Sequence, residues 1–194
     1  MASILGFQRQ FFPMVYLGVP TSRGRCSSIA FDGILARVRA RIFHWSGKLL
    51  SMGGKLILIK HVLNSMPLHL LQVLKPPKAV LVALGRLFNS FLWDKSREDK
   101  RTHWASWEKL CFPTEEGGLG VRLLEDMVKA FSYKLWWRLR QRGSLWSDFM
   151  YSKYIGDQHP LQVEVTRPTG TWKRLLGIRE VAEEQISWNL GPGM

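Results

Sequence analysis

The sequence predicts a mainly α-helical chain in two parts. Over several stretches, apolar residues recur at intervals of three and four, a spacing that places them on one face of a helix. Two segments lack this spacing, residues 10–20 and 102–120, and we expect short irregular or β pieces there. A hydrophobic fraction of 46% over 194 residues is enough to form a buried core.

The first expected helix starts near residue 31 and has one apolar face. Arg37 and Arg41 lie one turn apart on a flank of this face, with Lys48 nearly in line if the helix continues. Ser51 can cap a second helix, which Pro67 ends or kinks. The apolar face of the first helix consists of Phe31, Ile34, Leu35, Val38, Ile42 and Trp45.

A third helix is expected after Pro76 and Pro77, since proline is tolerated at the start of a helix. The charged segment 94–102 follows this helix, and it is the best internal boundary. The sequence therefore predicts two parts, residues 1–95 and 96–194. The apolar residues of the third helix are Val80, Leu81, Leu84, Leu87, Phe88 and Phe91.

Within the second part, the segment 117–120, Gly-Gly-Leu-Gly, is too rich in glycine for a helix and predicts a tight turn. A long helix is expected over 123–142, a short one over 145–154, an open loop over 159–170 and a last helical segment over 172–186. The expected apolar stripe of the long helix is Leu124, Met127, Phe131, Leu135 and Leu139.

Charge favours a polyanionic partner. The formal net charge is +13 and the pI is about 10.2, which favours nucleic acid, although a basic surface can also simply keep a protein soluble. No window approaches ~18 continuous apolar residues, so no membrane partner is expected. Cys26 and Cys111 show no disulfide or zinc spacing, and no signal peptide is evident. We expect an intracellular protein, nuclear or cytoplasmic, and not a secreted one.

Several short motifs follow one another in an order that resembles one family. Singly they are weak, but in this order they resemble the region after the polymerase palm in plant non-LTR (LINE-type) retroelement reverse transcriptases. The motifs are Tyr16-Leu17-Gly18-Val19-Pro20, Leu50-Ser51, Gly53-Gly54-Lys55, Phe91-Leu92-Trp93, His103-Trp104, Trp107, Leu110-Cys111, Gly117-Gly118-Leu119-Gly120 and Trp136-Trp137-Arg138.

This resemblance implies an architecture. Residues 1–95 would form a thumb-like helical bundle that grips the primer–template duplex, and residues 96–194 a helical connector before a zinc-binding segment that the chain does not reach. The fingers and palm of the family are not in this sequence. We therefore expect a catalytically inactive fragment that cannot polymerise DNA, and not an enzyme.

No constellation of side chains predicts catalysis or metal binding. The acidic pairs, at residues 98–99, 115–116, 125–126 and 183–184, lie in charged loops or on helices, where solvated faces explain them. His103 and Cys111 could form a nucleophile pair, but the sequence offers no third orienting residue. We predict no catalytic residue, no metal and no cofactor.

Cationic side chains on the thumb-like helices are the candidate nucleic-acid contacts. Such groups neutralise phosphates without reading sequence, which suits an RNA–DNA hybrid or duplex DNA; an ordinary solvated helix face is an equal alternative. Trp104 and Trp107 could stack on unpaired bases, although packing in a core is favoured. The candidates are Arg37, Arg41, Lys48, Lys55 and Lys60, followed by Lys100 and Arg101.

A structural or protein-interaction remnant with no nucleic-acid role is the alternative function. A thumb separated from its palm would leave part of its apolar surface uncovered. This hypothesis predicts self-association through that apolar face.

Overall fold

The computed structural model describes residues 14–21, 27–46, 50–94 and 102–187, and all structural statements refer to these residues. They are mainly helical, as the sequence predicts. The chain divides into two compact units, Met1–Val121 and Arg122–Met194. The charged connection that we took as the boundary, and with it the division between 95 and 96, therefore falls inside the first unit.

A short hairpin opens the first unit. The strands β1 (Met14–Tyr16) and β2 (Val19–Thr21) pair antiparallel, in the region where the sequence predicts an irregular or β piece. Leu17 and Gly18 form the turn with φ of 49° and 79°, the left-handed conformation that a two-residue hairpin turn requires. His69 of α3 (Leu68–Val73) donates from Nε2 to the Leu17 carbonyl over 2.9 Å, which ties the hairpin to the helices.

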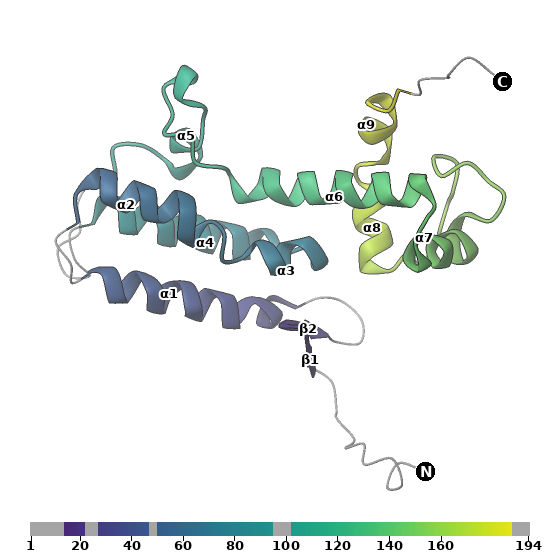
Figure 1. Cartoon of the computed structure of the whole chain (residues 1–194), viewed down its shortest axis with the longest axis horizontal. Helices are drawn as coiled ribbons and strands as arrows, with labels where there is room; N and C mark the ends of the chain where they lie inside the picture. Colours follow the sequence, from purple (N-terminus) through teal and green to yellow (C-terminus); the bar gives the residue numbers. More distant parts are fainter. Residues whose placement is uncertain (1–13, 22–26, 47–49, 95–101, 188–194) are drawn as a thin grey trace, which may run out of the picture. The chain divides into compact units, whose positions relative to one another are not determined.

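Two helical segments pack on one central helix in the first unit (Figure 1). The first segment is the 3-10 turn η1 (Ser28–Phe31), which leads into α1 (Asp32–Ser46). The second is α2 (Met52–Leu58), which continues into the π-helical turn η2 (Ile59–Leu63). Helices α1 and α2 both contact the central helix, α4 (Lys78–Trp93). The buried apolar residues of these segments are Phe31, Ile34, Leu35, Val38, Ile59, Leu63, Val80, Leu84, Phe88, Phe91 and Leu92.

Helix α5 (Trp107–Leu110) explains why the first unit extends beyond the charged connection. The Trp107 ring lies edge-on to Phe88 of α4, with 5.7 Å between ring centres. Gly85 provides the room, because a Cβ at that position would lie 3.0 Å from Trp107 Cδ1. Trp107 therefore joins the segment after residue 102 to the core of the first unit. Residues 102–120 form α5 and the 3-10 turn η3 (Thr114–Glu116) rather than strands.

The glycine-rich segment after η3 forms the tight turn that the sequence predicts. Gly117 and Gly120 have positive φ, 81° and 63°. Backbone hydrogen bonds close the turn, from Gly118 N to Pro113 O at 2.9 Å and from Gly120 N to Phe112 O at 3.0 Å. A Cβ on Gly118 would overlap the Phe112 carbonyl, so this position admits glycine only.

We therefore expect Gly118→Ala to lower the free energy of unfolding of the first unit by about 2 kcal/mol or more, because the backbone must move and the turn loses hydrogen bonds. Gly33→Ala in α1 is a suitable control within the same unit, since nothing lies within 4 Å of a Cβ there. Urea denaturation of both variants measures the difference. An unchanged midpoint for Gly118→Ala would show that the turn tolerates a side chain.

The second unit packs its helices on α6 (Leu124–Gln141; Figure 1). These are α7 (Leu145–Met150), which continues into the π-helical turn η4 (Tyr151–Ile155), α8 (Gly170–Leu176) and α9 (Arg179–Glu184). The single helical segment predicted over 172–186 is thus two helices. The core consists of Trp136, Leu139, Met150, Ile155, Val163, Trp172, Leu175 and Ala182.

The buried face of α6 differs from the predicted stripe. Its inward residues are Leu124, Val128, Ser132, Trp136 and Leu139, whereas Met127, Phe131 and Leu135 are only partly buried. The reason is a polar contact within the unit. Arg174 of α8 is buried and donates from Nε to Ser132 Oγ at 2.8 Å and from Nη2 to the Val128 carbonyl at 3.0 Å. Burial also lowers the pKa of Arg174 below its ordinary value.

Candidate nucleic-acid interface

Helix α1 has one buried apolar face and one exposed cationic face. Ile34, Leu35 and Val38 are buried, whereas Arg37 and Arg41 are exposed and lie one helical turn apart, as the sequence predicts. Arg39 is exposed as well, and among residues 32–46 Asp32 is the only carboxylate. We call Arg37 and Arg41 the α1 arginine face; Arg39, two residues from each of them, lies on another side of the helix.

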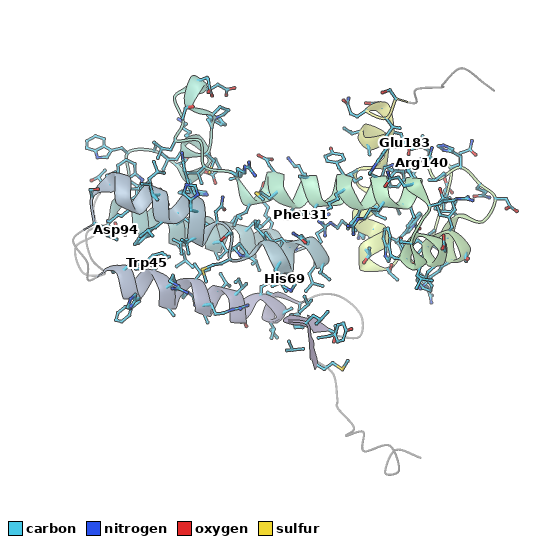
Figure 2. The ribbon with its side chains drawn as sticks, in the orientation of Figure 1. Trp45, His69, Asp94, Phe131, Arg140 and Glu183 are labelled. Carbon is cyan, nitrogen blue, oxygen red and sulfur yellow. The ribbon has the colours of Figure 1, made fainter. Side chains whose placement is uncertain are left out.

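Trp45 lies at the end of α1 beside this face (Figure 2). The Arg41 guanidinium carbon is 5.8 Å from the centre of the Trp45 ring, within the range of a cation–π contact. The Trp45 ring in turn lies 6.0 Å from the Phe91 ring of α4. One end of the α1 arginine face is therefore held next to the core.

Lys55 is engaged in a contact between elements of the first unit. Its Nζ donates to the Asp94 carbonyl over 2.6 Å and lies 5.8 Å from the centre of the Phe91 ring. Asp94 is the C-cap of α4 (Figure 2), so the ammonium group lies where the helix has unpaired carbonyls and a partial negative charge. Lys55 thus joins α2 to the end of α4.

The structure separates the remaining candidates. Lys60 is partly buried in η2, close enough to the glycine turn that a Cβ on Gly120 would lie 3.6 Å from its Nζ. The structure therefore brings Arg37 and Arg41 together and places Lys55 and Lys60 on a different helical segment. Whether any of them contacts nucleic acid stays a prediction. Lys48, Lys100 and Arg101 lie outside the described residues.

The two tryptophans before and within α5 have different environments. Trp107 is buried, which confirms the core packing that we favoured for it. The same interpretation is wrong for Trp104, which is 83% exposed because it precedes α5 and misses the contact with Phe88 and Gly85. Next to it, His103 Nε2 lies 3.1 Å from Asp94 Oδ1 rather than serving the Cys111 pair considered above.

One acidic residue that we assigned to a solvated face is largely covered by its neighbours instead. The Glu183 carboxylate is 13% exposed, accepts a hydrogen bond from Trp136 Nε1 at 2.8 Å and pairs with Arg140 Nε at 2.9 Å (Figure 2). The cause is the packing of α9 on α6, which brings this carboxylate next to the indole N–H of Trp136 and the guanidinium of Arg140. No group of three or more metal-ligating side chains occurs within the part of the chain that the structure describes, and none of the helices described there is long and apolar enough to cross a membrane.

Two proteins of Arabidopsis thaliana are similar to this chain. The “Putative ribonuclease H protein At1g65750” is 36% identical over 184 residues, which cover 90% of this chain. The chain therefore spans only 29% of the length of that relative. The “Uncharacterized mitochondrial protein AtMg00310” is 26% identical over 133 residues, which cover 67% of this chain and 86% of that protein. No protein-family model matches the chain, and no solved structure does.

The first relative corrects one prediction. We predicted that the chain is not an enzyme, but a protein that matches 90% of its length bears the name of an enzyme, ribonuclease H, and this finding overturns that prediction. The matches support a retroelement-related chain in general terms. They leave the finer assignment to the thumb region as a proposal.

Proposed function

We propose that this chain is a retroelement-derived segment that binds the backbone of an RNA–DNA hybrid or a DNA duplex without reading its sequence. The observation that supports this function best is the α1 arginine face, Arg37 and Arg41. Exposed guanidinium groups on a helix contact phosphate oxygens, and such contacts give affinity but no sequence information.

The geometry of α1 suits a phosphate backbone. Arg37 and Arg41 are separated by about 6 Å along the helix axis, so each guanidinium can contact a different phosphate of one strand. The apolar residues of α1 are buried against the rest of the first unit, which fixes the side of α1 that faces solvent. Arg offers a planar set of donors that can contact a phosphate through two hydrogen bonds.

Two further observations agree with this function. The net charge of the whole chain is +13, which favours a polyanionic partner. The first relative is named after ribonuclease H, an enzyme that acts on nucleic acid. We further propose that the chain corresponds to the thumb and connector region that the motif order resembles.

The test is a titration of the full chain against a fluorescent RNA–DNA hybrid at two salt concentrations, beside a basic protein of equal net charge. We expect tighter binding than that of the control protein, and an affinity that falls steeply with salt because bound cations release counterions. Binding no tighter than that of the control protein would contradict the proposed function.

Self-association is the second candidate, and exposed apolar side chains of the first unit favour it. Tyr16 and Leu17 at the hairpin turn and Phe43 on α1 are each more than 60% exposed. Tyr16 and Leu17 are neighbours in the chain, and exposed apolar groups that lie next to one another often mark a protein contact. Sedimentation over a range of protein concentrations tests this candidate: a monomer at every concentration would contradict it.

A further inference from the structure

We propose a second nucleic-acid site on the second unit, specific for single-stranded DNA or RNA. It consists of Arg142, Phe149, Tyr151, Lys153 and Tyr154, which we call the aromatic–basic ledge. The proposal goes beyond the function above, since it concerns another unit and unpaired nucleic acid. Its residues come from the end of α6, from α7 and from η4.

Cations lie against aromatic rings throughout the ledge. The Arg142 guanidinium carbon is 3.9 Å from the centre of the Tyr151 ring. Lys153 Nζ is 5.3 Å from the Phe149 ring and 5.3 Å from the Tyr154 ring. Each contact is within the range of a cation–π interaction. Lys153 therefore has two rings beside it, Phe149 and Tyr154, and Arg142 has a third, Tyr151.

One side of the ledge is anchored in the core of the second unit. The Tyr154 ring stacks on buried Trp172, with 4.7 Å between ring centres and 9° between ring planes. Its hydroxyl donates to Thr169 Oγ1 at 2.9 Å and accepts from Thr169 N at 3.3 Å. Tyr154 is thus a support rather than a contact surface, and it fixes Lys153.

The other side of the ledge is open. Phe149 is 57% exposed although it is large and apolar, so one face of its ring is available to a ligand. Lys153 and Arg142 are exposed as well. An exposed ring next to a cation is the arrangement that binds single strands: a base stacks on Phe149, and Lys153 contacts an adjacent phosphate. A duplex would not fit, because its bases are already stacked on one another.

The backbone around the ledge carries strain. Arg142 has φ of 43°, a conformation that residues with a Cβ rarely adopt. The following helix contains the π-helical turn η4, with a hydrogen bond of 2.9 Å from Gly156 N to Tyr151 O. Strained residues and π-helical turns are both enriched at functional sites. Here the strained residue is the one that places a guanidinium on Tyr151.

Removal of the open ring tests the proposal. We expect Phe149→Ala to weaken binding of a fluorescent single-stranded oligothymidylate about 10-fold, since one stacked base is lost. Leu145→Ala is the matched control: Leu145 lies on the same helix and is more exposed than Phe149, but it has no aromatic ring on which a base can stack, and we expect no change. Equal effects of the two variants, or none from Phe149→Ala, would overturn the proposal.

Arg142→Gly separates a role in binding from a role in stability. Glycine relieves the positive φ, so we expect the melting temperature to stay or rise while single-strand affinity falls several-fold. A falling melting temperature with unchanged affinity would show that Arg142 only stabilises the fold.

The proposal can also fail independently of the proposed function. Arg37→Glu/Arg41→Glu should weaken binding of the hybrid, and Phe149→Ala should weaken binding of the single strand. If Phe149→Ala alone abolished binding of both the hybrid and the single strand, the ledge would not be a separate site.

Discussion

Replacing Arg37 and Arg41 with Glu lowers the affinity for an RNA–DNA hybrid about 100-fold at ~50 mM salt, if α1 is the duplex contact. Two phosphate contacts are lost, so the slope of log affinity against log salt becomes shallower by about 2. The two new carboxylates add repulsion from the phosphates. Both side chains are exposed on a helix whose other face is buried, so we expect the fold to persist.

The control for this variant keeps the charge change and moves its position. Lys78 and Arg86 are exposed on α4 of the same unit, and Lys78→Glu/Arg86→Glu changes the net charge by the same amount. We expect this control to weaken binding far less. If both double variants lose affinity equally, binding depends on total charge and not on α1. If the α1 variant binds as tightly as the wild type, the site assignment is wrong.

Trp172→Ala is expected to lower the free energy of unfolding of the second unit by about 3–5 kcal/mol, the usual cost of truncating a buried Trp. Trp172 is fully buried and stacks on Tyr154 in the centre of that core. Domains of this size are commonly stable by only about 5–15 kcal/mol, so the loss would leave the second unit marginal. The anchor of the aromatic–basic ledge would be lost with it.

Hydrogen exchange read by mass spectrometry measures this effect segment by segment. We expect faster exchange over α6, α7 and α8 and unchanged exchange over α1 and α4, because the latter belong to the other unit. Trp104→Ala serves as the control, since exposed Trp104 should contribute little to stability. Protection of the second unit equal to that of the wild type would contradict the assigned core.

The helical period predicted the parts of the fold in which apolar residues alone form the buried face. The faces of α1 and α4 follow the predicted stripes closely, and Ser51 caps α2 as expected, accepting from Gly54 N at 3.2 Å. The period failed on α6, where Ser132 faces inward because buried Arg174 needs an acceptor. Glu183 was misassigned for the same reason. A polar residue gives no sign in sequence that a distant donor will bury it.

The candidate site was predictable to a similar extent. The spacing of Arg37 and Arg41 placed them on one exposed face, and the structure agrees. The sequence could not show that Lys55 would cap α4, because that contact joins residues 39 apart in the chain. The aromatic–basic ledge was missed, although three aromatic residues and one lysine within residues 149–154 were a signal in the sequence. The positive φ at Arg142 and the π-helical turn, which complete the ledge, arise only in the folded chain.

The most direct test of the central claim is protection of arginine side chains by bound hybrid. The full chain is treated with phenylglyoxal, with and without saturating RNA–DNA hybrid, and modified residues are identified by mass spectrometry. We predict that Arg37 and Arg41 are protected by the hybrid while Arg86 on α4 reacts equally in both samples. Equal modification of Arg37 and Arg41 with and without hybrid would contradict the account.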